Sequence, residues 1–189
     1  MLRLIVGFLP WIIFGALGNA RPSIALILAL AVSAIAVARQ VFSHSLKILD
    51  VVTFVFFVFV AVGLIGFGWT ILATYMTLVV NLTLMAVAWG SLLAGAPFTI
   101  QYAREQTPPE VWTTPLFLRV NQAITAVWGL SFFLSAMISL YRHAAGDDSV
   151  AARYGGIALS AAALIFTVYF PDWYRARVLR AGAPAGGSR

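Results

Sequence analysis

The stretch PFTIQYAREQTPPEVW, residues 97–112, carries most of the side chains that could do chemistry in this sequence. An arginine and two glutamates fall within seven residues there, beside a tyrosine, a tryptophan and a Pro-Pro step. These residues could serve acid–base chemistry, or they could form a surface that contacts a partner. We call residues 97–112 the connector, because they separate two long apolar runs. The predicted contact surface consists of Tyr102, Arg104, Glu105, Glu110, Trp112 and Arg119.

The spacing inside the connector favours a structural explanation for one of its glutamates. Thr107-Pro-Pro-Glu110 has the spacing of a capping box, in which the threonine hydroxyl accepts from the third helical amide and the glutamate reaches back. Pro108 would occupy the first helical position. Thr114-Pro115 offers a second helix start of this kind. We therefore predict Glu110 to be a cap and not a catalytic acid.

A second candidate site is a row of polar side chains within an apolar run. On a continuous helix, spacings of four, three and four residues place such side chains on one face. The row consists of Thr70, Thr74, Thr77 and Asn81. It could line a narrow polar path. Alternatively, the threonines could bond their own helix backbone and Asn81 a neighbouring helix.

Asn121 and Gln122 are polar residues at the start of another apolar run. They could contact a lipid headgroup or the connector, or simply lie at headgroup depth. We predict no catalytic, cofactor-binding or metal-binding residues. His44 and His143 are expected on opposite membrane sides, and the phosphate-binding loop, HExxH and GxSxG motifs are missing from the sequence. The sequence thus predicts a protein that is not an enzyme and needs no cofactor.

The composition indicates that lipid is the main solvent of this chain. Of its 189 residues, 62% are hydrophobic and 10% are charged, whereas a soluble domain carries about 25% charged residues. The mean hydropathy is +0.96. The net charge of +6 comes from basic residues scattered singly at the ends of apolar runs, which argues against nucleic acid as a partner. The lack of cysteine excludes disulfides and thiolate sites.

The apolar runs predict an all-α helix bundle that crosses the membrane about six times. A hydrocarbon core of about 30 Å needs about 20 apolar residues, and backbone amides in lipid must be satisfied within the helix. The expected spans are near residues 4–19, 22–39, 48–68, 70–95, 116–141 and 154–171. They form three hairpins in one domain, residues 1–174, followed by a basic, disordered tail over residues 175–189. The glycine-rich turn between spans three and four could be tight or re-entrant.

The basic residues predict the orientation of these spans. With six spans, both termini share one side of the membrane, and that side holds nine of the twelve lysines and arginines. The nine are Arg3, Arg39, Lys47, Arg104, Arg119, Arg175, Arg177, Arg180 and Arg189. The positive-inside rule therefore predicts cytoplasmic termini and a cytoplasmic connector.

A faint internal repeat links two of the expected spans. SLKILDVVTFVF (45–56) aligns with FLRVNQAITAVW (117–128), so that Lys47 matches Arg119 and Thr53 matches Thr125. Some transporters are built from such repeats. However, any span that enters from the cytoplasm tends to begin with a basic residue, so the match could also arise without a true repeat.

The sequence resembles the bacterial inner-membrane YciB family, the intracellular septation protein A family. The resemblance rests on FLPWIIFGAL, on PFTIQ followed by PPEVW, on RVNQAITAVWGLSFFLSAM and on ALIFTVYF near the end. The present sequence lacks the lysine-rich connectors of that family, and its segment 107–118 is longer. The resemblance implies a protein that maintains the envelope and septum through contacts with other membrane proteins, and it transfers no functional residues.

Three functions follow as expectations. The first is a non-enzymatic protein of the bacterial cytoplasmic membrane that organises the envelope or septum through protein or lipid contacts. The second is a small transporter or channel that uses the polar row. The third is an accessory subunit of a larger membrane complex. The expected partners are the lipid bilayer and other membrane proteins or further copies of this chain.

Overall fold

The computed structural model describes residues 2–18 and 20–182, and within them the regular structure is entirely helical. Among these residues, three short helical segments are not α-helical: η1 is a π-helix, and η2 and η3 are 3₁₀ helices. The elements are α1 (Leu2–Gly7), α2 (Leu9–Leu17), α3 (Pro22–Phe42), α4 (Ile48–Ala61), η1 (Val62–Gly66), α5 (Thr70–Thr74), α6 (Met76–Leu93), α7 (Phe98–Ala103), η2 (Arg104–Gln106), η3 (Pro109–Val111), α8 (Pro115–Ala145) and α9 (Val150–Gly182).

Five helical segments of the described chain are long and apolar enough to cross a membrane. They are Pro22–Phe42, Ile48–Gly66, Met76–Leu93, Pro115–Ala145 and Val150–Arg180. The chain is thus an all-α protein with the character of a multi-pass membrane protein. The predicted first span is different, because it is divided at Phe8 into α1 and α2. Pro10 lies in the first turn of α2, where its missing N–H does no harm. The two short helices together reach about 24 Å.

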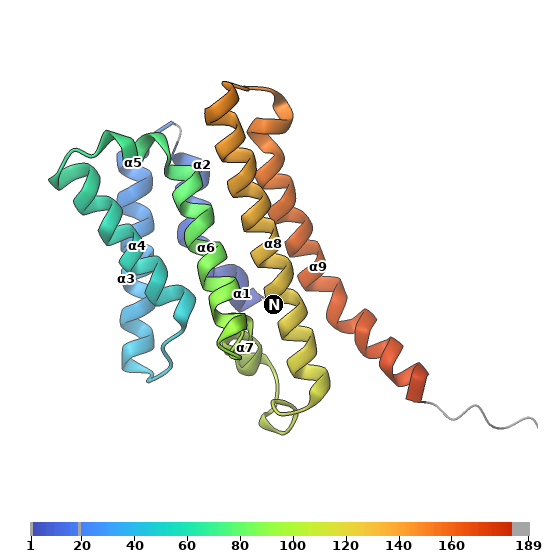
Figure 1. Ribbon diagram of the computed structural model, residues 1–189. Helices are drawn as coiled ribbons and strands as arrows, with labels where there is room; N and C mark the ends of the chain where they lie inside the picture. Colours follow the sequence, from blue (N-terminus) through green and yellow to red (C-terminus); the bar gives the residue numbers. More distant parts are fainter. Residues whose placement is uncertain (1, 19, 183–189) are drawn as a thin grey trace, which may run out of the picture.

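The helices pack as two groups of three. Helix α3 lies between α2 and α4, and α8 lies between α6 and α9. In Figure 1, the α2–α3 and α8–α9 turns lie at one end of the bundle, while the α3–α4 turn and the connector lie at the other. We call the latter the connector end. Helix α9 packs along α8 at the edge of the bundle (Figure 1).

Aromatic side chains fill the centre where the first segment meets the other helices. Phe8 stacks on Trp128 of α8 with ring centroids 4.7 Å apart. The Trp11 indole donates to Thr53 Oγ1 of α4 at 2.8 Å, and the Trp128 indole donates to Thr167 Oγ1 of α9 at 3.0 Å. Each bond satisfies a buried polar group between two helices. The broken first segment therefore serves as core packing for both groups.

The buried threonines also bear on the internal repeat. Thr53 and Thr125, which the alignment equates, are both almost fully buried. Thr53 accepts from Trp11, whereas Thr125 shares a hydrogen bond of 2.8 Å with Thr99 of α7. Both threonines join their helix to another element, but their partners differ. A true repeat stays a prediction.

Two helix ends differ from the sequence-based expectation. The span expected over residues 70–95 is interrupted at Tyr75, where α5 ends and α6 begins. The span expected to end at residue 171 continues through Pro171 to Gly182. Residues 175–182 are therefore helical and not disordered, and residues 183–189, including Arg189, lie outside the described residues. The extension is stabilised by Arg177, which lies 5.3 Å from the Trp173 ring one turn earlier.

Candidate functional site

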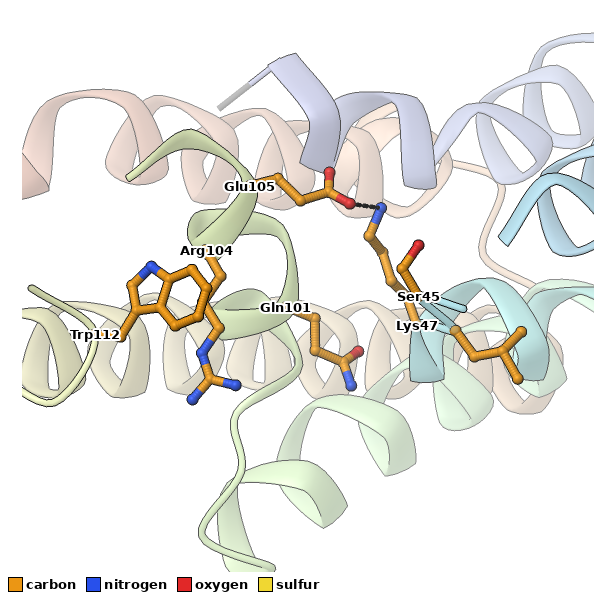
Figure 2. A pocket seen from close by; sticks show the side chains of 7 residues that line it. Ser45, Lys47, Gln101, Arg104, Glu105 and Trp112 are labelled. Atoms are coloured by element: carbon orange, nitrogen blue, oxygen red, sulfur yellow. Dashed lines mark ion pairs between the residues drawn. The ribbon is translucent and has the colours of Figure 1, made fainter. Parts of the chain in front are cut away.

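Segments far apart in the sequence meet through Glu105 at the connector end. Its carboxylate accepts from Lys47 Nζ at 2.8 Å, as Figure 2 shows, and from Arg3 Nη1 at 2.9 Å. Lys47 belongs to the α3–α4 turn and Arg3 to α1. Partial burial acts to raise the pKa of Glu105, but the hydrogen bonds and charges of Lys47 and Arg3 outweigh it and lower the pKa below its ordinary value of 4.5. Glu105 thus fastens the connector to two other segments.

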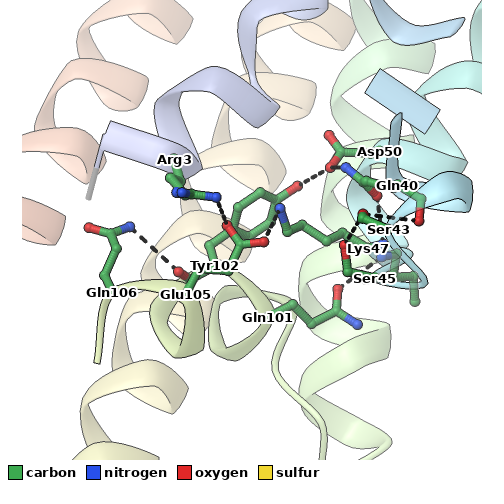
Figure 3. A network of polar contacts seen from close by, with 11 residues as sticks. Arg3, Gln40, Ser43, Ser45, Lys47, Asp50, Gln101, Tyr102, Glu105 and Gln106 are labelled. Carbon is green, nitrogen blue, oxygen red and sulfur yellow. Dashed lines mark hydrogen bonds and ion pairs between the residues drawn. The ribbon is translucent and has the colours of Figure 1, made fainter. Parts of the chain in front are cut away.

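A buried carboxylate lies deeper in the same network (Figure 3). Asp50, in the first turn of α4, is 5% exposed. Its Oδ2 accepts from the Gln40 side-chain amide of α3 and from the Tyr102 hydroxyl of α7, the latter at 3.0 Å. A carboxylate near a helix N-terminus is also favoured by the helix dipole. Asp50 therefore joins α3, α4 and α7 through charge-assisted hydrogen bonds.

Two glutamines satisfy the first amides of α4. The N-cap position is Lys47, whose side chain makes no cap bond. Instead, Gln40 Oε1 accepts from the Lys47 amide and Gln101 Oε1 accepts from the Ile48 amide, each at 2.9 Å. Without these glutamines, the two backbone amides would need water or another acceptor. The polar cluster of the connector end thus consists of Arg3, Gln40, Lys47, Asp50, Gln101, Tyr102 and Glu105 (Figure 3).

Tyr102 is an internal residue and not part of a contact surface. It is 2% exposed, and Lys47 Nζ lies 4.8 Å from its ring centroid. Burial, followed by the negative charge of Asp50, raises the pKa of Tyr102 well above its ordinary value of 10.0. A Cβ atom added at Gly7 would lie 2.7 Å from the Tyr102 hydroxyl. The ring is thus held from several sides, and its hydroxyl remains a donor to Asp50.

The connector does not contain the predicted capping box. Thr107 does not cap a helix: its hydroxyl donates to the Ala103 carbonyl at 2.9 Å. The Trp112 indole N–H approaches both the Thr107 carbonyl oxygen, at 3.1 Å, and its hydroxyl oxygen, at 3.2 Å. Two consecutive prolines favour a short 3₁₀ turn here over a longer helix, since neither can donate a backbone N–H. The cap at Thr114, however, is confirmed, because its hydroxyl accepts from the Phe117 amide at 3.3 Å.

The remaining residues of the predicted surface are distributed over the outside of the connector end. Glu110 and Arg119 are exposed. Arg104 is also exposed, and its guanidinium lies 5.2 Å from the ring centroid of Trp112. Trp112 itself is half-buried. These four side chains are therefore available to a partner, whereas Tyr102 is not.

The two polar residues at the start of α8 have different positions. Asn121 is buried: its side chain donates to the Phe117 carbonyl at 2.8 Å, and its backbone carbonyl accepts from Thr99 of α7 at 3.1 Å. Gln122 is exposed. Asn121 thus joins α7 to α8, and Gln122 alone is open to a headgroup.

The polar row does not lie on one continuous helix. The break at Tyr75 separates Thr70 and Thr74 on α5 from Thr77 and Asn81 on α6. The Thr74 hydroxyl donates to the Thr70 carbonyl at 3.2 Å, and the Asn81 side chain donates to the Thr77 carbonyl at 2.8 Å. The three threonines are exposed on the outside of the bundle. The Thr74 bond corresponds to the structural alternative given for the threonines, whereas Asn81 bonds its own helix and not a neighbouring one.

Sequence reasoning missed the buried part of the polar cluster. Asp50 is one of six acidic residues in the chain, and it stands three positions after a lysine at the start of an apolar run. This position at the start of a helix was the only sequence signal that Asp50 could belong to a polar site. Gln40 and Gln101 gave none, because each is an isolated amide whose partner lies elsewhere in the sequence.

The cluster binds protein elements together more than it offers a reactive centre. Both oxygens of Glu105 and Oδ2 of Asp50 accept from donors of the cluster itself. No group of three or more His, Cys, Asp or Glu residues in the described chain could hold a metal ion. Comparisons with protein-family models, curated proteins and solved structures give no match to this chain.

In the Glu105→Gln variant, the free energy of unfolding is expected to change less between neutral and acid pH than it does in the wild type. Because the folded-state pKa of Glu105 is lowered, its contribution is present above its ordinary pKa of 4.5 and is lost as the pH falls through the folded-state value. A partly exposed ion pair contributes about 0.2–1 kcal/mol. The melting temperature of the wild type in detergent should exceed that of Glu105→Gln by about 1–3 °C near neutral pH.

This difference should shrink at low pH. Glu110→Gln is the matched control, since it removes an exposed carboxylate that makes no ion pair within the described residues. A difference between wild type and Glu105→Gln that stays constant into the acid range, or that Glu110→Gln reproduces, would contradict the role given to Glu105.

Proposed function

We propose that this chain is a non-enzymatic multi-pass protein of the bacterial cytoplasmic membrane, with its termini and connector in the cytoplasm. It acts through contacts made at the connector end. The gathering of basic residues at this end supports the orientation, since Arg3, Lys47 and Arg104 all lie there. The opposite turn holds Arg142 paired with Asp148 at 3.0 Å, which leaves less positive charge on that side.

The observation that carries this proposal is that the connector is fastened to the rest of the bundle while two of its charged side chains, Arg104 and Glu110, stay exposed. Glu105 and Gln101 fasten it to α1 and to the start of α4. Within the connector, the Trp112 indole donates a hydrogen bond to the Thr107 carbonyl. A surface that is already ordered loses less conformational entropy when a partner binds. Exposed arginine and a half-buried tryptophan are also the residue types that contribute most at protein interfaces.

The resemblance to the septation protein family suggests the process in which these contacts act. On that basis we propose that the protein organises the cell envelope or the division septum. Other membrane proteins or further copies of the chain are its protein partners, and the surrounding lipid is its solvent. The polar row does not support the transporter alternative, because its three threonines are exposed on the outside of the bundle and line no path within it.

The accessory-subunit alternative has one favourable observation. Helix α9 packs only against one edge of the bundle, and large apolar side chains such as Ile157, Tyr169 and Leu179 are 66–70% exposed. Lipid chains can cover these residues, and so can another membrane protein. An accessory role would use the same connector surface, so one experiment addresses both readings.

Reversing the charges at Glu110 and Arg119 together is expected to reduce recovery of protein partners by about tenfold, since two lost interfacial charge contacts are worth more than 1.4 kcal/mol. The double variant Glu110→Lys, Arg119→Glu should be purified from native membranes in mild detergent, with quantification of every co-purifying protein. Neither side chain belongs to the polar cluster, so we expect normal expression and melting temperature.

Arg153→Glu is the matched control, because Arg153 is exposed at the opposite end of the bundle. It should retain the partners that the double variant loses. Equal recovery of the same proteins with wild type, control and double variant would show that the connector surface is not their binding site.

A further inference from the structure

An open pocket separates the α3–α4 turn from the connector. Its volume is about 360 Å³, and its walls are Ser45, Leu46, Lys47, Gln101, Arg104, Glu105 and Trp112 (Figure 2). The pocket combines two cations, a carboxylate, an amide and a hydroxyl with apolar walls. It lies at the ends of the membrane-spanning helices α3 and α4, where headgroups meet the protein.

Two groups at the pocket have hydrogen-bond donors without an acceptor in the described chain. Gln101 Oε1 accepts from the Ile48 amide, which fixes the side-chain amide and leaves both hydrogens of Nε2 directed elsewhere. Arg104 stacks on Trp112 and pairs with no carboxylate of the described residues. Figure 2 shows the Gln101 amide nitrogen and the Arg104 guanidinium pointing to the same side of the connector.

The charge of the pocket favours an anion. Glu105 is the carboxylate that lines it, and it is already paired with both Lys47 and Arg3. Its negative charge is therefore compensated within the protein. The Arg104 charge is left over, and a planar guanidinium is well suited to bind phosphate oxygens.

Exposed apolar side chains at the end of α3 and in the α3–α4 turn distinguish a lipid from a free anion. Leu46, which lines the pocket, is 55% exposed. Phe42, four residues earlier at the end of α3, is 86% exposed. In water, such exposure would be unfavourable, whereas acyl chains would cover both residues. Basic pockets between membrane helices on the cytoplasmic side are a known physical basis for binding anionic headgroups.

We propose that this pocket binds the phosphate of an anionic glycerophospholipid, with Arg104 and Gln101 donating to its oxygens and Leu46 lying against an acyl chain. This inference names a ligand for the connector end. It rests on the proposed function for the position of the pocket at a membrane surface.

The test is native mass spectrometry of the full chain, delipidated in mild detergent and titrated with phosphatidylglycerol, phosphatidylcholine or inorganic phosphate. The wild type should bind one phosphatidylglycerol about tenfold more tightly than phosphatidylcholine. Both lipids carry the phosphate, but the choline group adds a positive charge that Arg104 and Lys47 disfavour. Gln101→Glu keeps an oxygen for the Ile48 amide but replaces the donors by a negative charge. It should weaken phosphatidylglycerol binding by about tenfold, and Arg104→Gln should weaken it by about three- to tenfold.

Arg119→Gln is the matched control, since it removes an exposed arginine of the same end that does not line the pocket. It should bind phosphatidylglycerol within about twofold of the wild type. Equal binding of the two lipids, or unchanged binding in both pocket variants, would overturn the proposal. So would displacement of the lipid by inorganic phosphate at equal concentration, which would indicate a site for the free anion. The charge reversal at Glu110 and Arg119 tests protein partners separately, so either proposal can fail alone.

Discussion

Gly129→Ala is expected to destabilise the folded protein by about 1–3 kcal/mol, the usual cost of overpacking a well-filled core. Gly129 lies on α8 where this helix packs against α6. A Cβ atom at this position would overlap the Trp89 indole, with Nε1 and Cδ1 as its nearest atoms. The indole cannot simply rotate away, because its N–H donates to the Ala126 carbonyl at 3.4 Å and its ring packs against Phe133. Either α6 and α8 must separate, or Trp89 must give up these contacts.

The control for this prediction is the neighbouring glycine on α6. A Cβ atom added at Gly90 would meet nothing within 4 Å, so Gly90→Ala adds a better helix former without a clash. It should stabilise the protein by about 0.5–1 kcal/mol. Unfolding by SDS titration in mixed micelles measures both variants. Equal stability of Gly129→Ala and Gly90→Ala would refute the close α6–α8 contact.

A second variant assigns the effect to the indole itself. In a Trp89→Ala background, the added methyl group of Gly129→Ala has room, so its cost should fall to within about 0.5 kcal/mol of zero. An undiminished cost in that background would place the clash elsewhere, since no other neighbouring atom would have been removed.

The sequence predicted elements well where local chemistry decides them. The start of α8 follows from Thr114 and Pro115, whose capping and backbone preferences act within a few residues. For the same reason, the long apolar runs predicted the five helical segments that are long and apolar enough to cross a membrane. The capping box at Thr107 failed because two prolines and the indole of Trp112 offered the local backbone a different set of hydrogen bonds.

The polar cluster could not be predicted in this way. Arg3 and Glu105 are 102 residues apart, and Asp50 and Tyr102 are 52 residues apart. A partner at such a distance is chosen by the packing of whole helices, which leaves no periodic trace. The row from Thr70 to Asn81 failed for the opposite reason. Its spacing assumed an unbroken helix, and the turn at Tyr75 removed that condition.

Asp50→Ala is expected to lower the free energy of unfolding by about 2–4 kcal/mol, because it leaves buried donors without an acceptor. The Gln40 amide and the Tyr102 hydroxyl both donate to Asp50 Oδ2, and water cannot easily replace the carboxylate at a site 5% exposed. Asp148→Ala is the matched control. The Asp148 side chain is 73% exposed in the α8–α9 turn, so its loss should cost less than about 1 kcal/mol.

The Asp50–Tyr102 bond can be isolated from the rest of the cluster by a double-mutant cycle. Tyr102→Phe removes the hydroxyl, keeps the ring under Lys47 and should cost about 1 kcal/mol. In that background one donor to Asp50 is already missing, so Asp50→Ala should cost about 1 kcal/mol less than it does in the wild type. If the two losses of unfolding free energy are additive, Asp50 and Tyr102 act independently. If Asp50→Ala costs no more unfolding free energy than Asp148→Ala, the cluster does not hold α3, α4 and α7 together. Since the connector is fastened to the bundle through these same elements, the size of this coupling also sets how firmly the proposed contact surface and lipid pocket are positioned.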